Sequence, residues 1–124
     1  MATNRSSTKV RTAKAIADVR ELADIAQRSA TAAKKAAKKS IAAAAAGRLS
    51  EAFSHMGDAS RAYEVARKHA TYACDTAIGY NADRATHTVM INVACAAMRA
   101  VAVANEASAA ATRSYPHKPD FYVD

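Results

Sequence analysis

The feature that most constrains this chain is a set of apolar stripes in which alanine recurs at alternating spacings of three and four residues. This spacing is the period of a helix that packs lengthwise against other helices. Because alanine is small, each helix can approach its neighbours closely, but each buried residue removes little apolar area from water. The pattern therefore predicts long helices around a thin core.

Three stripes of this kind follow one another along the chain. The first consists of Ile16, Val19, Ala23, Ala26, Ala30, Ala33, Ala37 and Ala44, with the polar Ser40 in its last gap. The second consists of Leu49, Ala52, Met56, Ala59, Tyr63, Ala66, Ala70, Ala73 and Ala77. The third consists of Val89, Val93, Ala96, Ala100, Val103, Ala107 and Ala110. Each stripe predicts a helix of about 30 or more residues, roughly 45 Å or longer.

Composition agrees with an all-helical fold. Of the 124 residues, 35 are alanine, and the chain has two Leu, two Phe, three Gly, two Pro and no Trp. So few turn-forming residues leave little with which to build a sheet. The expected fold class is all-α, an elongated bundle of three long Ala-rich helices with short loops.

Glycines mark the expected helix boundaries. Gly47 can take the left-handed position after the alanine run, and Ser50 can then cap the next helix. Gly79 ends the second helix, and Asn81 can cap the third. A break at Gly57 is the alternative: the first helix would then extend to Met56 and the second would shorten, or a fourth helix would appear.

These boundaries divide the chain into three parts. Residues 1–7 are expected to be a flexible basic leader, and residues 8–113 a single helical domain. Its helices are expected at about residues 8–46, 50–78 and 82–113. Residues 114–124 contain two prolines and are expected to be an extended tail.

The third helix is the most apolar, because only Asn92 and Arg99 interrupt the apolar residues from position 89 to 104. A helix that is apolar nearly all round is normally buried, so we expect it at the centre of the bundle. The charge of Arg99 in mid-run argues against a membrane span. If helices two and three form a hairpin, facing positions sum to about 161, which places Glu64 beside Arg99 and Cys74 beside His87.

Charge is distributed unevenly. Residues 1–48 carry eleven Lys and Arg against three Asp and Glu, whereas residues 49–124 carry seven against eight. Lysines at positions i, i+1, i+4 and i+5 form a stripe about 140° wide, nearly opposite the alanine stripe of the first helix. The residues expected to contact phosphates are Lys34, Lys35, Lys38, Lys39, Arg28, Arg20, Lys14, Arg11 and Lys9.

The sequence AAKKAAKK around this stripe resembles the Lys/Ala-rich segments of linker-histone tails and of bacterial histone-like proteins. The resemblance covers about sixteen residues (31–46) and is one of composition. It implies sequence-independent affinity for nucleic acid and no reading of bases. The alternative interpretation of the lysines is a solvated helix face.

Sites for catalysis or metal binding are not expected. The four histidines lack the spacings of metal ligands, and no glycine-rich phosphate loop or catalytic triad is present. We therefore expect a protein that is not an enzyme and has no cofactor, metal or small-molecule substrate. Cys74 and Cys95 indicate free thiols in a reducing compartment. The expected location is the cytoplasm, although the first 17 residues also have the composition of a mitochondrial transit peptide.

Two functions remain open from the sequence. The first is non-enzymatic binding of DNA or RNA phosphates through the first helix, without a membrane partner. The second is a protein-interaction module, either a homo-oligomer or a small inhibitor or immunity-type protein of bacterial or phage origin. The tail residues Tyr115, Phe121 and Tyr122 are the expected partner-binding residues of that second function.

Overall fold

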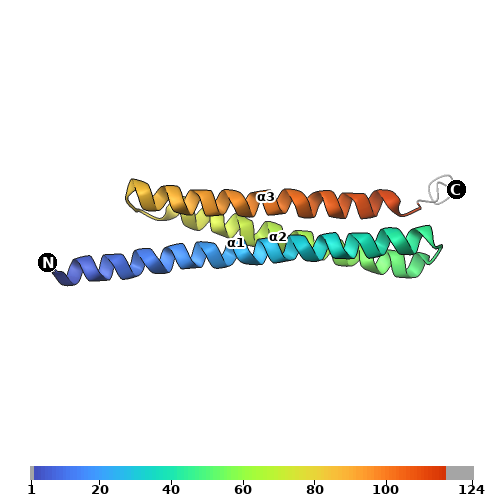
Figure 1. The fold of residues 1–124 in the computed structure, drawn as a ribbon, viewed down its shortest axis with the longest axis horizontal. Coiled ribbons are helices and arrows are strands. Elements are labelled where there is room, and N and C mark those ends of the chain that lie inside the picture. The colour runs from blue at the N-terminus through green and yellow to red at the C-terminus, as the bar shows by residue number, and fades with distance from the viewer. Residues whose placement is uncertain (1, 117–124) are drawn as a thin grey trace.

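The chain folds into three long helices that run up, down and up along a common axis (Figure 1). The computed structural model describes residues 2–116, with side chains from residue 8 onward. The helices are α1 (Ala2–Ala45), α2 (Leu49–Gly79) and α3 (Arg84–Ser114), and each contacts the other two. The predicted all-α bundle of three helices is confirmed.

The turn between α1 and α2 follows the expected chemistry only in part. Gly47 has a φ of 78°, the left-handed conformation predicted for it. Ser50 does not cap α2, because the helix begins at Leu49 and Arg48 holds the cap position without a side-chain hydrogen bond. The alternative break at Gly57 is wrong, since α2 continues through that residue.

The connection between α2 and α3 is capped by a residue other than the one predicted. α2 does end at Gly79, but Tyr80 and Asp83 then adopt extended conformations. Asp83 is the N-cap, and its carboxylate accepts a hydrogen bond of 2.8 Å from the backbone N–H of Thr86. The expected cap at Asn81 is wrong because α3 begins only at Arg84, which makes Asp83 the residue before its first turn.

The start of α1 and the end of α3 compare differently with the predicted boundaries. α1 is helical from Ala2, so residues 2–7 continue the helix where a flexible leader was expected. These first turns extend past the ends of the other two helices (Figure 1). α3 ends at Ser114, close to the predicted boundary, and residues 117–124 of the expected tail lie outside the described residues.

The core is built almost entirely of alanine. Among the described residues, 21 apolar side chains are buried and 18 of them are alanine. The stripes predicted for α1 and α2 are confirmed, with Ala15 and Ala43 buried where Ile16 and Ala44 were expected. The polar residue in the α1 stripe, Ser40, is also buried, and its hydroxyl donates a hydrogen bond of 2.8 Å to the carbonyl of Ala52.

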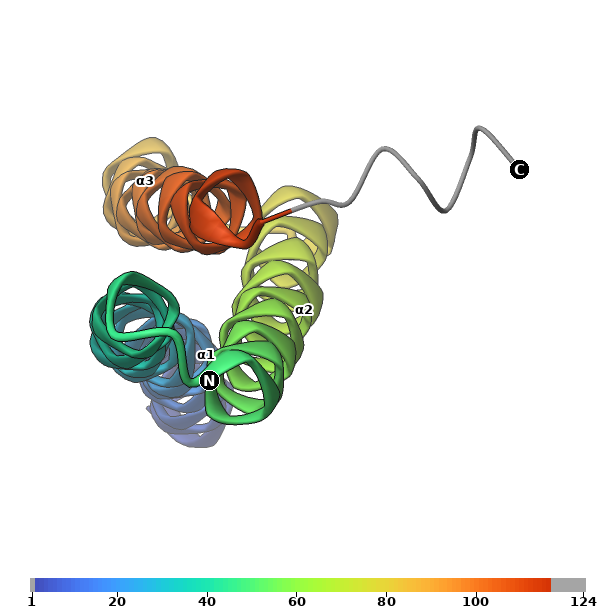
Figure 2. The ribbon, with the colours of Figure 1, turned by 90° about the vertical axis from the view of Figure 1, so that its right-hand side faces the viewer.

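The stripe predicted for α3 is wrong by one residue, a rotation of about 100°. The buried residues of α3 are Met90, Ala94, Ala97, Ala100, Val101, Ala104 and Ala111. Of the predicted stripe only Ala100 is among them, whereas Val89 and Val103 are 37% and 44% exposed. α3 is also not central, because the three helices form a triangle in which each has an outer face (Figure 2). α3 carries apolar residues on two adjacent faces, so the period of its apolar residues fits either face equally well.

The register between α2 and α3 also differs from the expected hairpin. The hydroxyls of Ser60 and Ser108 are 3.2 Å apart, so facing positions sum to 168 and not to 161. The extended residues between the helices carry the start of α3 past the end of α2, which shifts the pairing by seven residues. The predicted contact of Glu64 with Arg99 is therefore wrong, and Glu64 pairs with Arg67 at 2.9 Å.

Candidate nucleic-acid interface

The lysine stripe consists of Lys34, Lys35, Lys38 and Lys39, and all four side chains are exposed. The stripe lies in the second half of α1, where alanines at positions 33 and 37 are buried and turn the lysines outward. Within residues 8–116, no carboxylate pairs with any of the four. No Asp or Glu occurs from position 25 to 50, so this part of α1 is uniformly positive.

Two of the other predicted phosphate ligands already have carboxylate partners. Arg28 pairs with Asp24 at 3.0 Å and Lys14 pairs with Asp18 at 3.1 Å, one turn apart on α1 in each case. All four side chains are about half exposed or more, so these pairs stabilise the helix little and cost little to break.

The remaining three predicted ligands, Lys9, Arg11 and Arg20, are exposed. Their ion pairing differs from that of Arg28, because the structure records no carboxylate beside them among residues 8–116. Asp18, Glu21 and Asp24 separate them from the lysine stripe along α1. The predicted row of nine cations is therefore two basic regions, and the lysine stripe is the denser one.

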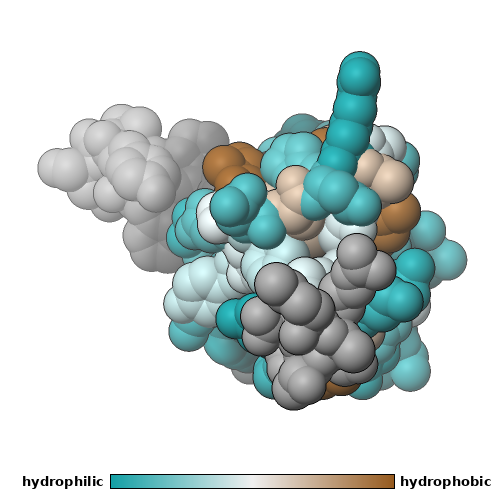
Figure 3. Space-filling model, turned by 90° about the vertical axis from the view of Figure 1, so that its left-hand side faces the viewer, coloured by the Kyte–Doolittle hydropathy of each residue, from teal (hydrophilic) through white to brown (hydrophobic). Residues whose placement is uncertain are grey.

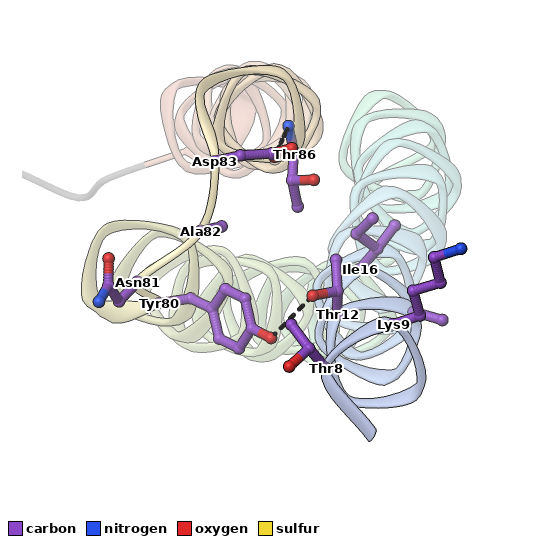
Figure 4. Close-up of a pocket in the computed structure, with 10 residues that line it drawn as sticks. Thr8, Lys9, Thr12, Ile16, Tyr80, Asn81, Ala82, Asp83 and Thr86 are labelled. Atoms are coloured by element: carbon purple, nitrogen blue, oxygen red, sulfur yellow. Dashed lines mark hydrogen bonds between the residues drawn. The ribbon is translucent and has the colours of Figure 1, made fainter. Parts of the chain in front are cut away.

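A hollow lies at the end of the bundle where α1 extends past α2 and α3 (Figure 4). It has a volume of about 710 Å³ and is lined mainly by Thr8, Lys9, Thr12, Tyr80, Asp83 and Thr86. The hydroxyls of Thr12 and Tyr80 are 3.2 Å apart and join α1 to the start of the loop. No pattern in the sequence predicts this hollow, because it depends on the register of three helices.

The chemistry of this hollow is that of a helix end. Hydrogen bonds from the side chain and backbone of Thr86 hold the pKa of Asp83 below its usual value. The carboxylate is therefore an ionised helix cap that already has its donors. Among the lining residues that the structure describes, Lys9 is the one cation and Asp83 the one carboxylate, and Asp83 already serves as the cap.

Within residues 8–116, the cysteines and histidines are not grouped as a reactive site. Burial raises the pKa of Cys74, as do the nearby Cys95 and Asp75, so its thiol is less ionised than a free cysteine. The shift in register removes the basis for the predicted proximity of Cys74 and His87. His69 bonds through its ring to the carbonyl of Val65 at 2.8 Å. Among the described residues, no three Cys, His, Asp or Glu side chains are grouped as metal ligands.

The predicted partner-binding tail is described only at its start. The ring of Tyr115 packs edge-to-face against Phe53 at a centroid distance of 5.9 Å, which ties the end of α3 to the beginning of α2. Phe121 and Tyr122 lie outside the described residues.

The surface is mixed in polarity. Viewed from the end at which α1 begins, hydrophilic side chains dominate and separate hydrophobic patches lie among them (Figure 3). Of the described helices, α3 has the length and composition of a membrane-spanning helix, and 28% of its most apolar stretch is buried in the bundle. Its apolar surface thus exceeds what α1 and α2 cover.

No family model, curated protein or solved structure matches the chain. The resemblance of the Lys/Ala segment to histone-like sequences therefore stays one of composition.

Proposed function

We propose that this protein binds the phosphate backbone of nucleic acid, without reading base sequence, through the lysine stripe of α1. The observation that carries the proposal is four exposed lysines on successive turns of one helix with no carboxylate beside them in residues 8–116. A lysine with no protein partner keeps its full positive charge available to a phosphate, and its counterions are released on binding.

The helix also fixes the geometry of the lysines before binding. Lys34 and Lys38 lie one turn apart, as do Lys35 and Lys39, so each pair is separated by about 6 Å along the axis. A stripe held on a packed helix loses less entropy on binding than a disordered basic tail. The proposed mode is therefore a preformed cationic surface, and not a tail that folds on its target.

The first experiment measures affinity for duplex DNA and for single-stranded RNA as a function of salt. Four lysines engaged with duplex DNA predict a slope of about −3.6 when the logarithm of the observed association constant is plotted against the logarithm of the salt concentration, since each phosphate neutralised contributes about −0.9. Oligonucleotides of unrelated sequence should bind with similar affinity. A slope near zero would contradict phosphate binding.

A matched pair of variants then locates the contact. The double variant K35Q/K39Q should reduce the size of the slope by about 1.8. The control K68Q/R84Q removes the same net charge from exposed positions on α2 and α3 and should leave the slope unchanged. If both variants reduce the slope equally, total charge decides the affinity and the lysine stripe is not the contact.

A second candidate function is a protein-interaction module. It is favoured by the half-exposed apolar face of α3, on which Val89 and Val103 remain accessible after the bundle has formed. Exposed apolar positions that continue along a helix often mark an interface.

A further inference from the structure

α3 carries a second apolar stripe beside the one that packs in the core. We call it the second seam, and its positions are seven residues apart: Val89, Ala96, Val103 and Ala110. Val89 and Val103 are exposed, while Ala96 and Ala110 are partly buried. A seven-residue apolar repeat next to an occupied one is the pattern of a helix that packs on two sides.

The second seam borders an open groove between α3 and α1. The hollow measures about 440 Å³, and its walls are Lys34 of α1 together with Ala102, Val103, Glu106, Ala107 and Ala110 of α3. Apart from the two charged residues at its rim, this lining is wholly apolar. Such a surface suits a further helix, which would bury the valines and leave the charges at the edge.

The charged residues of α3 beside the seam are uneven in their pairing. Arg99 is exposed and has no carboxylate partner within residues 8–116, since Glu64 is paired with Arg67. Glu106 lies seven residues further along the same face and pairs with Arg113 at 2.9 Å. An approaching helix that brings a carboxylate to Arg99 would therefore complete this face.

We propose that the groove is occupied by a second copy of this chain, whose α3 lies antiparallel to the first with a two-fold axis beside Val103. Facing positions in such a pair sum to about 206, so Val103 meets Val103 of the second copy and Ala96 meets Ala110. The same register brings Arg99 opposite Glu106 of the second copy, with a sum of 205, so the carboxylate that pairs with Arg113 within its own helix would be shared with Arg99 across the interface; symmetry repeats the pair. Charge complementarity thus selects the same chain in antiparallel orientation as the occupant.

The size of this contact sets its strength. The facing positions from Ala96 to Ala110 span about 21 Å of helix, and the alanines allow the two helices to approach closely. This is a short interface, so we expect a weak dimer with a dissociation constant of about 100 μM. The exposed ion pairs at the rim select the antiparallel orientation more than they add affinity.

The test is sedimentation equilibrium of the full chain, without nucleic acid, from about 10 μM to about 1 mM. The protein should pass from monomer to dimer over this range. V103E places two carboxylates at the two-fold axis and should weaken the dimer at least about tenfold. The control I78E changes a residue of α2 that is 69% exposed and should dimerise as the parent does.

Charge exchange tests the orientation. R99E and E106R should each weaken the dimer. The combined R99E/E106R variant should restore it, because the charges of both members of each ion pair are then reversed. These positions are exposed, so the variants should fold, which circular dichroism checks. A monomer at every concentration, or a dimer that V103E leaves intact, would overturn the proposal; failure of the combined variant to rescue would overturn the antiparallel pairing.

This inference does not depend on phosphate binding, although Lys34 belongs to both the lysine stripe and the rim of the groove. K35Q/K39Q should dimerise like the parent chain. V103E should give the same salt dependence per chain as the parent, because its lysine stripe is unchanged. Loss of one property without the other is therefore visible in these two variants.

Discussion

Replacing Met90 with alanine removes the largest side chain that the bundle buries completely among the described residues. The loss combines the apolar surface of the side chain with the cavity left behind. Buried methionine-to-alanine changes cost about 2–5 kcal/mol in general. Here the surrounding core is mostly alanine, whose side chains have no other rotamers with which to fill the space, so we expect about 3–5 kcal/mol.

This cost is large relative to the whole fold. A chain of this length is expected to have a free energy of unfolding of about 6–19 kcal/mol. The change should lower the midpoint of thermal unfolding by about 10–20 °C. Urea unfolding followed by circular dichroism gives the free energy, and a thermal scan gives the midpoint.

Two controls on the same helix make the experiment decisive. Met98 is 45% exposed, so the identical change M98A should cost less than about 1 kcal/mol. V89A lies in the stripe that the sequence predicted as the core, and it should likewise cost less than about 1 kcal/mol. If V89A or M98A proves as costly as M90A, the face of α3 that packs in the bundle is not the one described here.

Two further predictions concern backbone and cap. G47A should destabilise the protein by about 1–2 kcal/mol, because an L-residue is strained at a φ of 78°. G57A should stabilise it by up to about 1 kcal/mol, because alanine favours the helix and only the flexible Arg61 side chain lies close to the added Cβ, at 3.3 Å. D83A should lower the thermal midpoint by roughly 3–6 °C at neutral pH. The pKa of Asp83 is lowered in the folded state, so its stabilisation is present above the unfolded pKa of about 4 and is lost as pH falls through the folded pKa. The difference in thermal midpoint between D83A and the parent should therefore vanish in acid. A difference that persisted there would contradict a charged cap.

Much of α1 and α2 was predictable because each of these helices has one apolar stripe and one polar face. Where alanines recur at three and four residues and lysines occupy the opposite side, only one rotation of the helix buries the first and exposes the second. The exposure of the four lysines followed directly. Their lack of carboxylate partners within residues 8–116 also follows in part from sequence, since no acid lies within a turn of them.

The predictions for α3 failed for a different reason. Its apolar residues cover two adjacent faces, so the stripes through Val89 and through Met90 fit the helical period equally well. The predicted pairing of α2 with α3 was also wrong, because it assumed a symmetric hairpin, which places Arg99 beside Glu64. Tyr80 and Asp83, the first and last of the four residues between α2 and α3, are extended, and the connection shifts the register by two turns, which no local pattern reveals.

The sequence by itself determined that the chain is helical, where the helices end to within a few residues, and that a positive stripe faces outward from α1. These properties depend on residues close together along one helix. Only the tertiary structure decided which face of α3 enters the core, how α2 and α3 align, and which apolar positions remain exposed. Those depend on how three helices share a core too thin to cover every apolar residue, and the uncovered remainder on α3 is where we expect a second copy to bind.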